Sequence, residues 1–258
     1  MEITTELIKE LRDATGISVM QCKKALEEVG GDIEKALIVL KKKSGDIAAK
    51  KSDRDAKEGV IIVVNGTGKS VLLALHCETD FVAKNSDFTT LAQALADKAL
   101  TEGVDAMKAA SLDMINQIIQ KVGEKVELGT VKEIDGAVLG SYVHSGKSAV
   151  VVSLTGGTTD LAKDIAMHIP AMKPTYMERG EVTEDAVAKA KEVFAKEVAE
   201  SDKPQEIKDK MLEGKINTYF KEQTLMDQSF IKNPDMTIKA LLEKEKATIV
   251  TFVRESIA

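Results

Sequence analysis

Apolar residues recur at helical spacing in three short segments at the start of the chain. Gly16 ends the first segment, Ser18 stands where it can cap the second, and Asp32 precedes the third. We therefore predict a module of three short helices over residues 1–45. Residues 46–58 are Lys-rich and carry no apolar periodicity, so we predict a solvated linker there.

A pattern typical of a β-hairpin occurs twice in the middle of the chain, and an apolar helix pattern follows it each time. The first hairpin spans about residues 60–77, with a turn at Asn65, Gly66, Thr67 and Gly68, and Asn-Gly is a dipeptide that favours a tight turn. The second spans about residues 137–154 around a turn at Ser145. The two copies indicate two related subdomains, each built from an antiparallel sheet and a helix.

The first copy of this repeat carries an insertion. Lys69 and Leu91 are 22 positions apart, whereas the matching Lys147 and Leu161 are 14 apart, so the first copy is longer by eight. Residues 79–85 account for most of that difference. An insertion in one copy of a shared scaffold is a common way for function to be added to a fold.

The remaining patterns complete an α+β prediction. Two long helical segments flank Pro204, which is tolerated at a helix start but not inside a helix, so we predict an antiparallel helical hairpin. The predicted organisation is the following: a three-helix module (1–45), a linker (46–58), an N-terminal core subdomain (59–135), and a C-terminal core subdomain (136–258) that includes the hairpin (183–224). Shorter elements are predicted at these places: a helix at 112–121, strands at 126–134 and 248–253, and a helix at 237–244.

The insertion places a carboxylate, Asp80, beside a large aromatic side chain, Phe81, in what we predict to be a loop. The chain has no Trp and only six Phe, so a Phe in a loop is unusual. An exposed Phe forgoes roughly 1.5–3 kcal/mol of burial, and loops commonly carry binding residues. From the residues alone, two interpretations have equal weight: Phe81 packs back onto its own core, or a partner receives it.

Charge and composition restrict the partners. The formal net charge of −6 argues against a direct nucleic-acid binder, which usually shows a clustered basic excess. No apolar run approaches the roughly 18 residues that a membrane span needs, so we expect no membrane partner. Met1 is followed directly by a charged amphipathic helix pattern. We therefore expect a cytoplasmic protein whose two cysteines, Cys22 and Cys77, are reduced.

The candidate chemistry of an enzyme is sparse. Gly68-Lys69-Ser70 and Gly146-Lys147-Ser148 resemble the end of a phosphate-binding loop, but both lie between two strands and lack the required upstream Gly. The three histidines, His76, His144 and His168, show no metal-ligand spacing. We therefore expect no catalytic residue, no metal and no cofactor, and an enzyme is the least supported class of protein.

Residues 77–84, which include most of the insertion, resemble the signature loop of the elongation factor Ts family, nucleotide exchange factors for elongation factor Tu. The matching residues are Cys77, Glu78, Thr79, Asp80, Phe81, Val82, Ala83 and Lys84. Residues of the N-terminal module resemble the family's helical module, which is similar to ubiquitin-associated (UBA) domains: Leu11, Arg12, Thr15, Gly16, Met20, Cys22, Lys23, Lys24, Ala25, Leu26, Gly31, Asp32, Ile33 and Ala36. Further similarity covers Leu139, Gly140, Ser141, Tyr142, His144, the segment 165–169, Gln228, Ser229, Phe230, Leu241 and Leu242.

The resemblance implies a function and a set of contact residues. It implies that the segment Thr79, Asp80, Phe81 and Val82 enters the GTPase, elongation factor Tu, and disturbs the Mg²⁺ site there so that GDP leaves. It also implies secondary partner contacts at Arg12, Met20, Ala83 and His144. The sequence leaves the oligomeric state open, and a homodimer is compatible with it. The alternative function is a peptide- or ubiquitin-type binding adaptor that uses residues 1–45.

Overall fold

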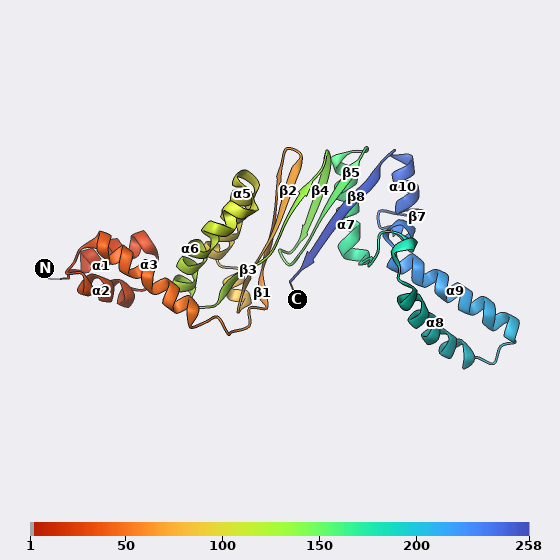
Figure 1. The fold of residues 1–258 in the computed structure, drawn as a ribbon, viewed down its shortest axis with the longest axis horizontal. Helices are drawn as coiled ribbons and strands as arrows, with labels where there is room; N and C mark the ends of the chain where they lie inside the picture. The colour runs from red at the N-terminus through yellow and green to blue at the C-terminus, as the bar shows by residue number, and fades with distance from the viewer. Residues whose placement is uncertain (1–2, 258) are drawn as a thin grey trace. The chain divides into compact units, whose positions relative to one another are not determined.

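Helices and small sheets combine in an α+β fold in the computed structural model, which describes residues 3–257 (Figure 1). This confirms the predicted fold class. Contacts along the chain define two compact units. The first comprises Met1–Ile134, Val143–Ala149 and Glu255–Ala258, and the second comprises Asp135–Tyr142 and Val150–Arg254. The domain boundaries at residues 45, 58 and 135 stay predictions.

The N-terminal module consists of α1 (Thr5–Thr15), α2 (Val19–Glu28) and α3 (Ile33–Ala49). Each helix begins with a side-chain cap that accepts a backbone N–H of the first turn: Thr4, Ser18 and Asp32. A separate apolar cluster that includes Leu11, Cys22, Ala25, Leu26 and Leu40 forms the module's core. The three predicted helices are therefore confirmed.

The predicted linker is wrong at its start, because α3 continues to Ala49. Its later turns bury Ser44 and pack Ile47 and Ala48 against the core of the first unit. Ser44 interrupts the apolar pattern, but its hydroxyl donates to the backbone oxygen of Lys41 and so can be buried on the helix face. The core-facing positions of α3 therefore include a polar residue. An analysis that follows only apolar residues ends the helix too early for this reason.

The rest of the first unit is built on the first hairpin. Its elements are β1 (Glu58–Gly66), β2 (Lys69–Cys77), α4 (Asp80–Ala83), α5 (Ser86–Glu102), α6 (Val104–Val122) and β3 (Val126–Asp135). The strand order is β1-β2-β3, and β1 and β2 are antiparallel. Asn65 and Gly66 lie inside β1, where the Asn65 amide oxygen accepts from the Ser70 hydroxyl, so the turn is confined to Thr67-Gly68, the second half of the predicted turn.

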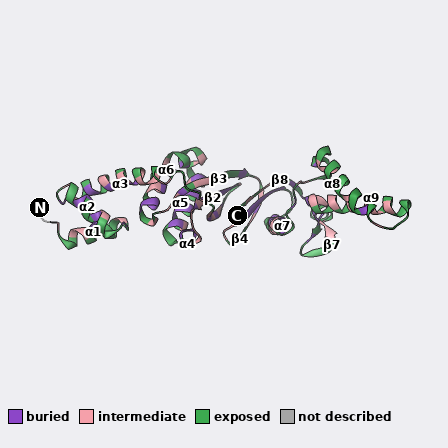
Figure 2. Ribbon diagram, turned by 90° about the horizontal axis from the view of Figure 1, so that it is seen from below, coloured by how far each residue is buried: buried purple, intermediate pink, exposed green. Residues whose placement is uncertain are grey.

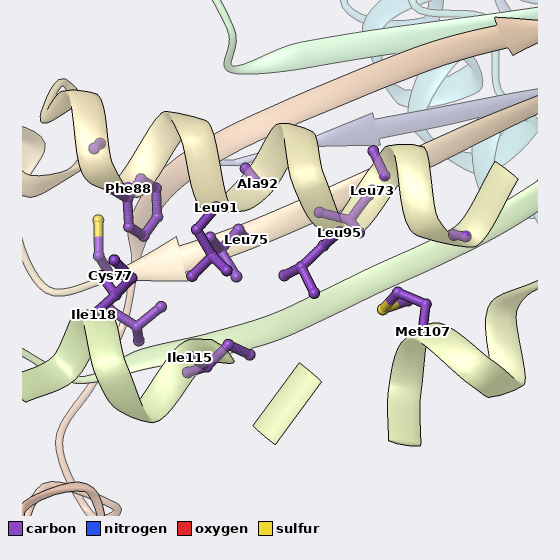
Figure 3. Packing of buried hydrophobic residues seen from close by; sticks show 14 of the residues in the cluster. Leu73, Leu75, Cys77, Phe88, Leu91, Ala92, Leu95, Met107, Ile115 and Ile118 are labelled. Atoms are coloured by element: carbon purple, nitrogen blue, oxygen red, sulfur yellow. The ribbon is translucent and has the colours of Figure 1, made fainter. Parts of the chain in front are cut away.

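Helix α5 packs on β1 and β2, and α6 packs on α5, which encloses the core of the first unit (Figure 3). The labelled core residues come from three elements: Leu73, Leu75 and Cys77 of β2; Phe88, Leu91, Ala92 and Leu95 of α5; and Met107, Ile115 and Ile118 of α6. Helix α6 begins at Val104, eight residues before the predicted start at 112. Met107 and Ser111 of its first half are buried, so tertiary packing extends the helix.

The second hairpin and the C-terminal part of the chain contain β4 (Val138–His144), β5 (Ser148–Thr155), α7 (Thr159–Met172), η1 (Arg179–Glu181), α8 (Glu184–Ala199), α9 (Gln205–Gln223), η2 (Leu225–Asp227), β6 (Ser229–Phe230), β7 (Asn233–Thr237), α10 (Ile238–Lys244) and β8 (Thr248–Ser256). The strand order of the larger sheet is β4-β5-β8, and β6 pairs with β7. Apolar residues of β5 and α7 form the second large core, which α10 completes.

The helical hairpin α8–α9 buries little of its surface (Figure 2). Val198 is the one buried residue of α8, and α9 has none. Its two helices contact each other through aromatic side chains, with Phe194 edge-on to Tyr219 at 6.4 Å between ring centroids. The hairpin predicted over 183–224 is thus present as two helices with a shared seam.

His168 links α7 to the segment that follows α9. Its Nδ1 accepts the backbone N–H of Ile231 at 3.3 Å, so the proton sits on Nε2, which donates to the Gln228 Oε1 at 2.9 Å. The Gln228 amide group donates in turn to the backbone oxygens of Met172 and Glu222. The imidazole is fully buried, and this burial lowers the pKa of His168.

The lowered pKa of His168 predicts a stability loss on mild acidification. The unfolded chain binds a proton at its ordinary His pKa, near 6.5, before the folded chain does, so the stability that the neutral ring contributes is lost as pH falls below that value. We expect the urea concentration at half-unfolding to decrease when the pH is lowered from 7.5 to 5.5. The variant His168→Gln should be less stable at pH 7.5 but should show a smaller fall. An equal fall in both proteins would contradict this role of His168.

Candidate functional site

The insertion after β2 is not the predicted loop but a single helical turn, α4 (Asp80–Ala83). Thr79 caps it, since its hydroxyl accepts the Val82 N–H at 3.4 Å. The backbone N–H groups of Ala83 and Lys84 donate to the oxygens of Thr79 and Asp80 at 3.1 Å. A turn this short has no helical cooperativity of its own, so neighbouring contacts must hold it.

The turn divides its residues between core and solvent. Val82 and Ala83 are each only 8% exposed and belong to the core cluster of the first unit, whereas Phe81 is 82% exposed. Successive helical residues point in different directions, so burying Val82 and Ala83 directs Phe81 away from the core. The structure thereby excludes the interpretation in which Phe81 packs back onto its own subdomain.

Side chains from distant segments fasten the turn from its N-terminal side. The carboxylate of Glu124 accepts two hydrogen bonds from Thr79, one from the backbone N–H at 3.0 Å and one from the hydroxyl at 2.7 Å. The carboxylate of Glu78 accepts the Lys125 N–H at 2.6 Å and binds the Arg54 guanidinium at 3.2 Å. Residues 124 and 125 thus hold both residues that precede Asp80.

The charged groups on the exposed side of the turn pair with each other. The Lys84 ammonium lies 2.7 Å from the Asp80 carboxylate, at a helical spacing of four, and this hydrogen bond lowers the pKa of Asp80. Asp80 is therefore ionised at neutral pH. Because both groups are exposed, the pair contributes little to stability and opens at small cost.

Cys77, the last residue of β2, is not poised to act as a nucleophile. Burial, with a further contribution from the nearby Glu124 charge, raises the pKa of Cys77 to about 12. Its thiol donates to the Thr79 carbonyl oxygen at 3.2 Å. The side chain acts as a packed apolar group with one polar contact.

The structure brings five of the predicted contact residues together in and beside α4: Thr79, Asp80, Phe81, Val82 and Ala83. Val82 and Ala83 anchor the turn, and a direct partner contact by either stays a prediction. Arg12 and Met20 lie on the N-terminal module, where both are exposed and Met20 is 61% so. His144 is the last residue of β4 and is also exposed.

Sequence reasoning missed Glu124, Arg54 and Lys125 as parts of the site, and it gave Glu78 no contact of its own. Glu124 follows Gly123, whose positive φ of 73° ends α6, and it reaches a residue 45 positions away. Such a contact depends on how α6 packs, and no local pattern indicates it. The Gly that ends the helix is the one signal that a specific turn occurs there.

Residues 3–257 offer no other chemistry of the kinds that metal sites or membrane spans require. Those residues contain no group of three or more His, Cys, Asp or Glu side chains placed to hold a metal ion, and none of their helices is both long and apolar enough to cross a membrane. Both Gly-Lys-Ser segments lie at hairpin turns between strands, as predicted. Lys147 N–H donates to the His144 oxygen at 3.0 Å across the second turn.

Comparison with known proteins identifies two regions of the chain. A family model described as Elongation factor TS matches residues 78–258, and one described as UBA-like domain matches residues 4–43. Elongation factor Ts of Aeromonas salmonicida is 42% identical over 262 residues, which cover 98% of this chain and 89% of the relative. Elongation factor Ts of Aeromonas hydrophila subsp. hydrophila is 41% identical with the same coverage. The chain, with its UBA-like N-terminal module and its exposed Phe81 turn, belongs to the elongation factor Ts family of translation elongation factors.

Proposed function

We propose that this protein binds elongation factor Tu in its GDP-bound form and promotes GDP release by inserting the segment Thr79–Val82. The single observation that supports this best is the exposure of Phe81 on a turn that Glu124 holds at Thr79 and that the core holds at Val82 and Ala83. An apolar side chain held in water gains burial only when a partner covers it. A fixed position also means that little conformational entropy is lost on binding.

The proposed mechanism makes and breaks no covalent bond. GTPases hold nucleotide partly through Mg²⁺, which bridges phosphate oxygens and protein ligands. Phe81 acts as a wedge that displaces side chains of the GTPase near this site. The Asp80 carboxylate, freed from Lys84, adds either a competing acceptor or a repulsive charge near the phosphates. The protein is therefore an exchange factor, and it is not an enzyme in the usual sense.

Secondary contacts support the insertion from other parts of the chain. The exposed Arg12 and Met20 of the N-terminal module contact the GTPase from a second direction, and His144 contributes a further contact. An exposed Met suits such a surface because its flexible thioether adapts to a partner. Translation elongation also implies a cytoplasmic location. The partner is a protein, with no direct nucleic-acid or membrane contact.

Thermodynamic linkage predicts how GDP affects the complex. If this protein weakens GDP binding by some factor, GDP must weaken binding of this protein by the same factor. We expect the dissociation constant for nucleotide-free elongation factor Tu to be lower than that for the GDP-bound form by at least about tenfold, within the range usual for coupled sites. Isothermal titration calorimetry of the purified partners measures both constants.

The same titration separates the proposed function from the adaptor alternative. A peptide- or ubiquitin-type adaptor that uses residues 1–45 would recognise a surface that GDP does not change. Equal dissociation constants with and without GDP would therefore contradict an exchange function and would favour the adaptor.

A further inference from the structure

The loop between α6 and β3, residues 123–125, lies beside residues 78–82, which we call the exchange segment. It makes hydrogen bonds to the first two residues of that segment. Glu124 contributes both carboxylate oxygens to Thr79, at 2.7 and 3.0 Å. Lys125 donates its backbone N–H to Glu78 and its ammonium to the Arg54 carbonyl oxygen at 2.9 Å. The loop therefore connects the exchange segment to the chain that follows α3.

Glu124 is the residue of this loop that acts on the turn directly. The Thr79 hydroxyl makes two hydrogen bonds. Its oxygen accepts the Val82 N–H, and its O–H donates to the Glu124 carboxylate. The second Glu124 oxygen fixes the Thr79 backbone N–H. The cap is thereby locked in one rotamer and one backbone position, which an isolated Thr cap does not achieve.

The consequence reaches Phe81, which Glu124 does not need to touch. The orientation of Phe81 depends on α4 remaining helical, and α4 is too short to be stable alone. Val82 and Ala83 anchor its later part in the core, but the start of the turn depends on Thr79 and its partner. Loss of Glu124 is therefore expected to let the turn fray from its N-terminal side, so that the Phe81 ring takes many directions.

We propose that Glu124 is a positioning residue for nucleotide exchange, which holds the Thr79 cap so that Phe81 is presented to the GTPase in one orientation. This inference rests on the proposed function. It assigns Glu124 no contact with the nucleotide or with Mg²⁺. Glu124 contributes by holding Thr79 in place. The length of its side chain should therefore affect the exchange rate more than its charge does.

The first test uses substitutions that separate reach from charge. Glu124→Gln removes the charge but keeps the length, and its amide can accept from the Thr79 N–H and donate to the Thr79 oxygen. Glu124→Asp keeps the charge but shortens the side chain by one carbon–carbon bond, about 1.5 Å, so it loses at least one of the two bonds. The measured quantity is the acceleration of fluorescent-GDP release from elongation factor Tu, compared with that given by the unsubstituted protein. We expect Glu124→Gln to lose no more than about threefold, and Glu124→Asp and Glu124→Ala to lose about tenfold.

A matched control lies three positions further along the same segment. Glu127 is exposed and pairs with Lys125 at 2.8 Å, without contact to Thr79. Glu127→Ala removes the same charge from β3, the strand that follows this loop, and should leave the release rate unchanged. If Glu124→Ala does not fold, the comparison of Gln with Asp carries the test alone.

Non-additivity with Phe81→Ala distinguishes positioning from general stability. If Glu124 acts through Phe81, then adding Glu124→Ala to Phe81→Ala should change the release rate by less than about twofold. Amide hydrogen exchange should also show faster exchange at Val82, Ala83 and Lys84 in Glu124→Ala, with the amides of β2 unchanged.

Three outcomes would overturn this inference. Charge would be the cause if Glu124→Asp kept full activity while Glu124→Gln lost it. Fully additive losses in the double variant would show that Glu124 acts independently of Phe81. If Phe81→Ala slows release but no Glu124 variant does, the positioning role alone is wrong; if Phe81→Ala has no effect, the proposed function falls as well.

Discussion

Phe81→Ala is expected to slow GDP release from elongation factor Tu by about 10- to 100-fold relative to the unsubstituted protein, compared at the same protein concentrations. Full burial of a Phe side chain gains about 1.5–3 kcal/mol, and each 1.4 kcal/mol corresponds to a factor of ten. That free energy is available only in the complex, because Phe81 is 82% exposed in the free protein. Stopped-flow fluorescence with a labelled GDP measures the rate.

The fold should not suffer from this substitution, since the removed ring lies in solvent. Thermal unfolding of Phe81→Ala should match that of the unsubstituted protein. Phe81→Leu retains most of the apolar surface and should lose less activity than Phe81→Ala. Asp80→Ala should also lose less, because Asp80 already has a partner in Lys84; a larger loss there would show that electrostatics dominate the mechanism.

Gly140→Ala should lower the free energy of unfolding by about 3 kcal/mol or more, through overpacking against backbone. A Cβ at this position of β4 would lie 2.2 Å from the Lys163 backbone nitrogen and 2.3 Å from the Ala162 carbonyl carbon, both in α7. Backbone atoms inside a helix cannot move aside singly, so α7 as a whole would have to leave the strand. Urea denaturation followed by circular dichroism measures the loss.

A second glycine in the same unit provides the control. Gly214 lies in α9, and a Cβ there would meet nothing within 4 Å. Gly214→Ala should therefore raise stability by about 1 kcal/mol, the usual helix-propensity difference. If Gly140→Ala were as stable as the unsubstituted protein, the close approach of β4 and α7 would be wrong.

The elements that carry their own start and stop signals were predicted well. The caps at Ser18 and Asp32, and the break at Pro204, lie where the chain itself specifies them. The errors occur where packing decides. The end of α3 and the first half of α6 are helical because tertiary contacts bury Ser44 and Ser111, which a hydrophobic pattern counts as polar.

In the candidate site, too, some features could be predicted from the sequence and others depend on tertiary packing. Phe81 could be singled out from the sequence because a large aromatic side chain lies in an insertion that the second copy of the repeat lacks. Its exposure could not be predicted, because that depends on Val82 and Ala83 entering the core instead. The hydrogen bonds from Thr79 to Glu124 could not be predicted either, since they join residues 45 positions apart.

The most direct test of the account is the GDP dissociation rate of elongation factor Tu measured at increasing concentrations of this protein. The rate should rise with concentration and reach a plateau well above the spontaneous rate, as the exchange complex becomes saturated. A rate that stays at the spontaneous value, although binding is detected, would contradict the proposal that the exposed Phe81 turn releases nucleotide.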